Sequence, residues 1–234
     1  MTLIDHLALL SAYDAAAVMF LLVGWLGISW RIEHPAKGRS SVTSLMAAYR
    51  RDWMVEFVTR DNRIFDATLV ASLRQGTSFF ASTCILAIGG VLALVGNTAP
   101  LRGVAEEFTA EAAPAFVWQV KLLIVALFLT NAFLKFVWAH RVFGYCSVVM
   151  GAVPNDPEHP LALPRARQAA ELNIRAAVNY NRGLQSMYFA LGALAWLIGP
   201  LALVIASSIV IWLLWSREFA SIPRDVLESE GAEP

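Results

Sequence analysis

The residues that could carry chemistry are few, and none of them is spaced as a known catalytic or metal-binding motif. The sequence has four histidines and two cysteines, and they lie far apart: His6, His34, His140, His159, Cys84 and Cys146. No CxxCH, HExxH or paired CxxC sequence occurs, and no GxSxG, P-loop or GxGxxG sequence. A cofactor site ligated by both His34 and His140 is geometrically conceivable, but surface or capping roles are favoured for these histidines. The sequence therefore predicts no catalytic residue, cofactor or metal ion, and it favours a protein that is not an enzyme.

Arginine, asparagine and aspartate side chains are concentrated in two segments, 31–76 and 139–183. If long helices hold these segments together, the polar side chains meet in one layer just outside the membrane. An arginine-rich layer at that depth suits anionic lipid headgroups or phosphate. The same groups can instead form an internal network of salt bridges and hydrogen bonds, which we favour. The candidate residues of this layer are Arg60, Asp61, Asn62, Arg63, Asp66, Arg74, His140, Arg141, Tyr145, Asn173, Arg175, Asn179, Asn181 and Arg182.

Three charged residues fall within strongly apolar stretches, where charge is costly and often functional. Asp14 lies about 10 Å into the first stretch and Lys121 about 8 Å into the third, measured from the same side at 1.5 Å per residue. These matching depths predict an Asp14–Lys121 pair. Lys135 and Asn131 share a helical face with Lys121, and that face should point toward the other helices. A structural pair, or lysines that reach the interface with their long side chains, is favoured over a transport or proton-relay role.

The elements that position these residues are predicted to be membrane-spanning helices. Hydrophobic residues make up 58% of the 234 residues and charged residues only 15%, against about 25% charged in soluble domains. Four stretches have the roughly 20 apolar residues that a bilayer requires, namely 7–30, 77–95, 116–138 and 184–215. We therefore predict an all-α, polytopic membrane protein built as a bundle of four transmembrane helices. It forms one domain over 1–220, followed by an acidic tail, 221–234. The formal net charge of zero gives no electrostatic reason to bind nucleic acid.

The basic residues indicate how the helices cross the membrane. Segment 31–76 carries eight Lys or Arg residues and segment 139–183 carries five, whereas 96–115 has one basic and three acidic residues. Because basic loops stay in the cytoplasm, both long segments are predicted to be cytoplasmic and both termini to lie outside the cytoplasm. The predicted location is the cell inner membrane, where the protein contacts the lipid bilayer.

The long intervals between helix-breaking residues indicate that three of the helices continue beyond the bilayer. Uninterrupted stretches of about 35 residues reach about 50 Å, whereas the hydrocarbon core is about 30 Å thick. The second, third and fourth helices should therefore extend on the cytoplasmic side, and Gly199-Pro200 should kink the fourth helix. In 41–59, large apolar residues recur every four positions from Leu45 to Phe57. This pattern predicts a cytoplasmic amphipathic helix, lying either on the inner leaflet or against the bundle.

Small residues form a stripe along the second predicted helix. Ser78, Ser82, Gly89, Ala93 and Gly96, together with Ile85, fall within roughly 80° of one another at about 100° per residue. Small side chains let a second helix approach closely, and close packing drives helix association in lipid. The neighbour could be a helix of the same chain or of a second copy, and the sequence leaves both open.

Three strings of residues carry a family resemblance: WMVEFVTRDNRIFDATLVASLRQGTSFFASTCILAIGGVLALVG, FVWAHRVFGYCSVVMGAVP and NYNRGLQSMYFALGALAWLIGPL. The RDNRI-x-D and SFFAST segments are the most specific parts. The chain resembles the bacterial membrane proteins catalogued as domain of unknown function 599, from about residue 15 to 220. The resemblance implies an inner-membrane protein with four spans, and it implies no activity.

Three functions stay open for such a protein. The favoured one is a non-enzymatic scaffold or accessory subunit, which packs with itself as a homo-oligomer or with a larger membrane complex. The alternative is an oligomeric binder or transporter of an anionic lipid or small molecule, using the polar layer with Lys121, Asn131 and Lys135. A membrane enzyme or haem protein would depend only on His34 and His140.

Overall fold

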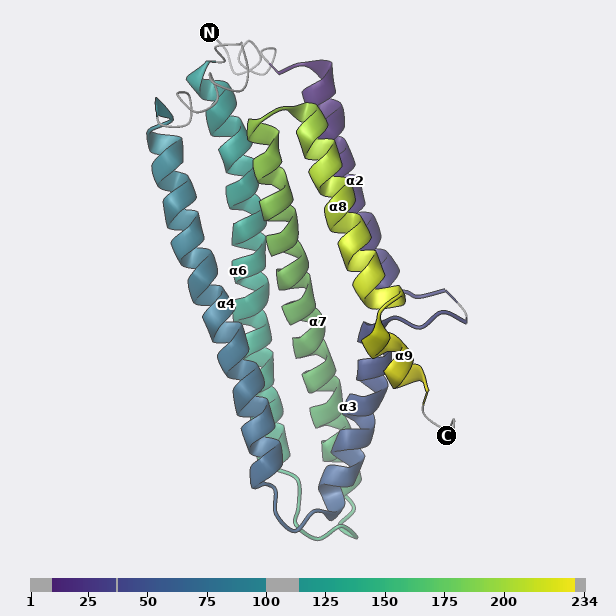
Figure 1. Cartoon of the computed structure of the whole chain (residues 1–234). Coiled ribbons are helices and arrows are strands. Elements are labelled where there is room, and N and C mark those ends of the chain that lie inside the picture. Colours follow the sequence, from purple (N-terminus) through teal and green to yellow (C-terminus); the bar gives the residue numbers. More distant parts are fainter. Residues whose placement is uncertain (1–9, 37, 100–113, 230–234) are drawn as a thin grey trace. The chain divides into compact units, whose positions relative to one another are not determined.

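The structure is a computed structural model that describes residues 10–36, 38–99 and 114–229, and every regular element in these ranges is a helix (Figure 1). In chain order they are α2 (Ala12–Glu33), α3 (Val42–Thr59), α4 (Ile64–Gly96), α6 (Ala115–Gly151), α7 (Ala162–Leu194), a 3-10 turn (Ala195–Leu197), α8 (Pro200–Phe219) and α9 (Ile222–Glu228). Within these ranges four stretches are long and apolar enough to cross a membrane: Ala12–Glu33, Ile64–Gly96, Ala115–Gly151 and Pro200–Glu228. The predicted all-α membrane fold is confirmed.

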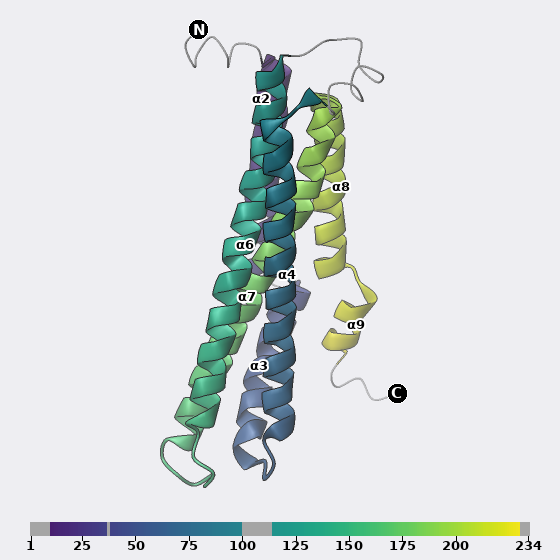
Figure 2. The same cartoon turned by 90° about the vertical axis from the view of Figure 1, so that its left-hand side faces the viewer.

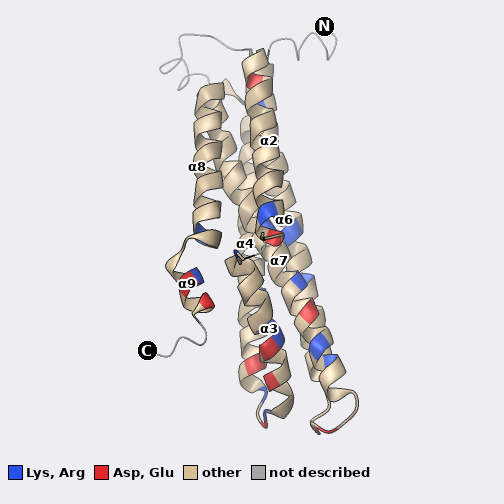
Figure 3. Cartoon of the chain, turned by 90° about the vertical axis from the view of Figure 1, so that its right-hand side faces the viewer, with Lys and Arg blue, Asp and Glu red and all other residues tan. Residues whose placement is uncertain are grey.

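The chain divides into two compact units, and α4, α6 and α7 contribute residues to both. Unit 1 comprises Met1–Arg31, Thr83–Ala132 and Leu184–Trp215, and unit 2 comprises Ile32–Ser82, Phe133–Gly183 and Ser216–Pro234. Unit 1 therefore takes most of the apolar stretches, and unit 2 takes most of the basic segments. Figure 3 shows the consequence, because the charged residues gather on α3, α7 and α9, while α2 and α8 are uncharged over most of their length.

Three of the helices are longer than a bilayer requires. α4, α6 and α7 contain 33, 37 and 33 residues. At 1.5 Å per residue they are about 50 to 55 Å long, against a hydrocarbon core of about 30 Å. Helices of this length agree with the absence of helix-breaking residues in the three stretches.

The predicted fourth span, 184–215, is two helices and not one kinked helix. α7 ends at Leu194, the 3-10 turn follows, and Pro200 begins α8. Gly199 has a φ of 159°, which residues with a Cβ atom rarely adopt. Proline is well placed at a first helical position because the N–H that it lacks would have no intrahelical partner there. The Gly-Pro pair therefore ends one helix and starts another.

Helix α8 returns through unit 1 beside α7 (Figures 1 and 2). A Cβ atom on Gly192 would lie 3.9 Å from the backbone of Ala206, although the two residues are 14 positions apart. α8 also runs parallel to α2, because Trp196 bonds to Asp14 and a Cβ atom on Gly24 would overlap Ile211. The beginning of α2 and the end of α8 consequently lie at opposite ends of unit 1. The sequence prediction of both termini on one side assumed a single fourth crossing, and the structure has two helices in its place.

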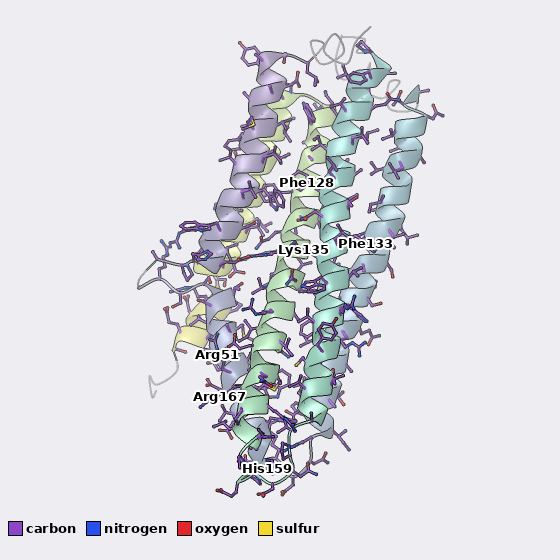
Figure 4. All side chains as sticks on the ribbon, turned by 180° about the vertical axis from the view of Figure 1, so that it is seen from behind. Arg51, Phe128, Phe133, Lys135, His159 and Arg167 are labelled. Carbon is purple, nitrogen blue, oxygen red and sulfur yellow. The ribbon has the colours of Figure 1, made fainter. Side chains whose placement is uncertain are left out.

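Aromatic side chains form the centre of unit 1. The ring of Phe128 on α6 meets Trp25 of α2 edge to face, with 5.1 Å between centroids, and it stacks on Phe189 of α7 at 6.1 Å (Figure 4). Aromatic pairs at these distances contribute about 0.5–1.5 kcal/mol beyond the area they bury. One residue thus links three helices.

The predicted amphipathic helix is α3, and it packs within unit 2. Ser41 caps its first turn, accepting a hydrogen bond from the Ser44 N–H at 3.1 Å. Met54, Phe57 and Val58 of α3 are buried in one apolar cluster with residues of α4, α6 and α7. Of the two placements that the sequence left open, the structure has the one against the bundle.

Candidate functional site

Asp14 and Lys121, the predicted intramembrane pair, meet through an indole ring and not directly. Trp196 Nε1 donates to Asp14 Oδ1 over 2.7 Å, and the Ser11 hydroxyl donates to Oδ2 over 2.6 Å. The buried Lys121 Nζ lies 5.7 Å from the Trp196 ring centroid and 5.4 Å from that of Trp118, within cation–π range. Among the described ion pairs none joins Asp14 to Lys121. The two charges therefore share one aromatic neighbour.

The predicted polar face of α6 divides between the two units. In unit 1, Asn131 Nδ2 donates to the buried Ser186 hydroxyl of α7 over 2.6 Å. Ser29 of α2 similarly donates to Gln185 of α7 over 2.7 Å. Lys135 belongs to unit 2, where it is half-buried on α6 (Figure 4). Sequence reasoning missed Gln185 and Ser186, although two adjacent polar residues in a predicted span are a usable signal.

The small-residue stripe of α4 does not pack against another described helix of this chain. Ser78, Ser82, Gly89, Ala93 and Gly96 are all exposed. A Cβ atom built on Gly89 or Gly96 would have no other atom within 4 Å. Only 6% of the apolar window of α4 is buried, against 44% for α6. The stripe therefore lies on the exposed surface of unit 1, and its members Ser78 and Ser82 lie on the exposed surface of unit 2.

The residues of the predicted cytoplasmic layer all lie in unit 2, but they form separate sets along the helices. Arg63 and Arg74 are eleven residues apart on α4 and its N-terminal flank, which corresponds to about 16 Å. One layer cannot hold both. Of the remaining members, Asp61, Asn62, Arg175 and Asn179 make only local contacts or lie on the surface: Asn62 caps the Ile64 N–H, and Asn179 donates to the Arg175 carbonyl.

The first set surrounds Asp66, whose side chain is fully buried. Its Oδ1 accepts from Trp53 Nε1 at 2.6 Å and from Arg60 at 2.7 Å, while Oδ2 has no hydrogen-bond partner. Next to it, Arg63 donates to the carbonyl oxygens of Val153 and Pro154 at 2.8 and 2.9 Å. These contacts tie the connection between α3 and α4 to the end of α6.

Further members pair with residues outside the predicted set. Arg182 donates two hydrogen bonds of 2.5 Å to the carboxylate of Glu33, and this contact raises the pKa of Arg182. Asn181 donates to Thr43 at 3.3 Å, and Asn173 accepts from Arg50. Within the set itself, Arg141 donates to Tyr145 on the exposed face of α6. Much of the predicted set therefore forms internal contacts.

Arg74 differs from these residues, because the described contacts satisfy only part of its guanidinium. Its Nη2 lies 3.3 Å from His140 Nε2, and its Nε is buried without a hydrogen-bond partner. Because an arginine can only donate, Nε2 of His140 must accept. The other ring nitrogen then carries the proton, and it lies 3.3 Å from both Thr77 Oγ1 and the Arg74 carbonyl oxygen. The His140 ring thereby orients the Arg74 guanidinium.

Arg74 lines a groove of about 330 Å³ between α4 and α6 in unit 2. Arg63 lies toward the other end of the groove, and Phe57, Ser147 and Asn155 are part of its lining. None of the described lining residues is acidic. The groove therefore presents positive charge at an apolar wall, an arrangement that attracts an anion.

A metal centre finds no support in the described ranges, where no group of three or more His, Cys, Asp or Glu residues could hold an ion. His34 and His140 are not brought together in any described contact: His140 bonds within the Arg74 set. His6 lies outside the described residues, and His159 lies in the connection between α6 and α7, where its Nδ1 accepts from the Leu161 N–H (Figure 4).

The fold and these contacts define a helical membrane protein with an arginine-lined groove and no catalytic motif. Comparison with family models identifies it further: residues 16–223 match the family described as Protein of unknown function, DUF599, and the chain belongs to this family. No match was found among curated proteins or among solved structures.

Proposed function

We propose that this protein is a membrane-embedded binding protein whose unit 2 takes a phosphate-bearing anion. The observation that carries the proposal is the position of Arg74, which lines the α4–α6 groove with a buried, unpaired Nε–H. A buried donor without a partner costs about 1–3 kcal/mol. An anionic ligand would supply the missing acceptor, and guanidinium groups pair especially well with phosphate oxygens.

The depth of Arg74 along α4 favours a lipid headgroup as the source of that phosphate. It precedes the predicted span 77–95 by three residues, so it lies about 5 Å beyond the apolar stretch. Headgroup phosphates occupy that depth at a membrane surface. The apolar part of the groove, which includes Phe57, Val70 and Met150, suits the rest of an amphipathic molecule.

Ligand-induced stabilisation tests the proposal. Detergent-solubilised protein is titrated with short-chain phosphatidylglycerol, with short-chain phosphatidylcholine and with inorganic phosphate, and the melting temperature is measured. Binding to the folded state raises the melting temperature by mass action. We expect a rise in the wild type and in the control Arg141→Gln, whose arginine contacts only Tyr145 among the described residues. The rise should be lost in Arg74→Gln.

The three probes separate the sources of phosphate. A rise with phosphatidylglycerol alone indicates an anionic lipid, and a rise with inorganic phosphate indicates a soluble compound. Arg74→Lys should retain part of the effect because it keeps the charge. Absence of any rise in the wild type, or an equal rise in Arg74→Gln, would show that the groove is not an anion site.

The proposal includes an orientation for the chain. We place unit 2, with its basic segments, on the cytoplasmic side of the inner membrane, following the excess of arginine there. Since the beginning of α2 and the end of α8 lie at opposite ends of unit 1, the N-terminal segment is then outside and the segment after α8 is cytoplasmic.

A second candidate function, a scaffold that assembles with itself, is favoured by the exposed stripe of α4. Gly89 and Gly96 leave open space on a helix whose apolar window is almost entirely exposed. A second copy of α4 could approach closely there. Assembly and anion binding are compatible, because the groove lies between α4 and α6 and the stripe faces outward.

A further inference from the structure

A second cavity, of about 440 Å³, lies in unit 2 and is separate from the Arg74 groove. Residues of α3, α4 and α6 line both spaces, whereas α7 and α8 line only this cavity. Its walls are largely apolar and include Met46, Leu73, Ile174 and Val178. No residue lines both spaces. The volume falls within the range of small-molecule sites, which are apolar enclosures with a few well-placed polar groups.

Arg50 of α3 supplies the polar group at one end of this cavity. Its guanidinium donates to Asn173 Oδ1, and Asn173 is fully buried. None of the described ion pairs involves Arg50. Burial lowers the pKa of Arg50, which means that its charge is poorly solvated. A charge in such surroundings is stabilised by an anion that the described chain does not provide.

Glu218 of α8 supplies the polar group at the other end. Its two carboxylate oxygens accept from the backbone N–H and the hydroxyl of Thr43, both at 3.0 Å. Asn181 donates to the same hydroxyl at 3.3 Å. These neutral donors fix the carboxylate in place, and the described ion pairs leave it without a cation.

The two charges lie at opposite ends of the cavity. Thr43, which holds Glu218, precedes Arg50 by seven residues on α3, or about 10 Å at 1.5 Å per residue. On α7, Asn181 and Asn173 are eight residues apart, or about 12 Å by the same rise. Both helices therefore give a separation of about 10 to 12 Å, and the apolar walls lie between the two charges.

We propose that this cavity binds a zwitterionic small molecule with an aliphatic spacer, its anionic group at Arg50 and its cationic group at Glu218. A ligand with only a negative charge would leave Glu218 without a counter-ion. A ligand with only a positive charge would leave Arg50 without one. A zwitterion pairs both, and its spacer lies along Met46, Leu73 and Ile174. The site is independent of the Arg74 groove, so either site can fail its test without the other.

Calorimetric titration of the full chain in detergent tests this with a matched set of probes: aminooctanoate, octanoate and octylamine. Aminooctanoate should bind the wild type at least tenfold more tightly than either singly charged probe. Arg50→Gln and Glu218→Gln should each weaken aminooctanoate binding by tenfold or more. The control Arg51→Gln should bind like the wild type, because Arg51 pairs with Glu171 on the exposed surface.

The variants should also exchange their preference between the singly charged probes. Glu218→Gln should bind octanoate more tightly than the wild type does, and Arg50→Gln should bind octylamine more tightly. These gains cannot arise from misfolding, and the melting temperature of each variant checks its integrity. Equal binding of octanoate and aminooctanoate, or no binding of any probe by the wild type, would overturn the proposal.

Discussion

Trp196 donates its indole N–H to the carboxylate of Asp14 across 2.7 Å, although 182 residues separate the two in the chain. The bond joins the reversal between α7 and α8 to the first turn of α2, and the same ring lies under Lys121. It therefore fixes three helices at one end of unit 1. It also explains why the predicted Asp14–Lys121 pair is indirect, since the indole accommodates both charges.

Replacing Trp196 by phenylalanine should destabilise the protein. The substitution keeps an aromatic ring beside Lys121 but removes the donor to Asp14, and a hydrogen bond to a charged group contributes about 1.5–3 kcal/mol. Trp118→Phe is the matched control, because the buried Trp118 Nε1 has no hydrogen-bond partner. We expect a lower melting temperature for Trp196→Phe and little change, or a rise, for Trp118→Phe. Similar losses in both variants would contradict the role of the bond.

The sequence was sufficient to predict the long helices, because apolar runs of that length have few alternatives. It also predicted α3, through the recurrence of apolar residues every four positions. It did not predict the reversal at Gly199-Pro200, since a Gly-Pro pair within an apolar run is compatible with both a kink and a turn. The choice depends on packing between residues far apart in sequence, such as Gly192 against Ala206.

The candidate site was predicted less well, for a related reason. Residue types placed Arg74, His140 and Asn173 in one region, and the structure has them in unit 2. Their partners are not encoded by local spacing: Arg50 meets Asn173 across 123 positions, and Arg182 meets Glu33 across 149. An arginine without a carboxylate, such as Arg74, becomes visible only once every other pairing is known.

Alanine at Gly183 should be destabilising, although it is a better helix former than glycine. A Cβ atom there would lie 2.7 Å from the ring of Phe136, which is fully buried and stacked on Phe80. Overpacking of this kind costs about 1–3 kcal/mol, more than the roughly 1 kcal/mol that alanine gains in a helix. In Gly90→Ala, the control, the added atom meets nothing within 4 Å. Thermal unfolding should show a decrease for the first variant and none for the second.

The reversal between α7 and α8 predicts where a reporter fused after Glu228 will be found. With unit 2 in the cytoplasm, the end of α8 is cytoplasmic too, so a green fluorescent protein fusion there should fluoresce. An alkaline phosphatase fusion at the same position should be inactive, because that enzyme folds only outside the cytoplasm. Active phosphatase at this position would instead support the single kinked crossing that the sequence suggested.

Self-association through α4 predicts a difference between two neighbouring glycines. Gly89 lies in the small-residue stripe and Gly90 lies about 100° away from it around the helix, while both have open space for a Cβ atom. A leucine at Gly89 would keep a second α4 at a distance, since close approach needs small side chains. Gly89→Leu should therefore lower the dimer fraction at least severalfold in lipid nanodiscs, measured by single-molecule photobleaching, while Gly90→Leu leaves it unchanged. Equal dimer fractions in the wild type and both variants would exclude the stripe as the contact, and a monomeric wild type would exclude assembly with itself.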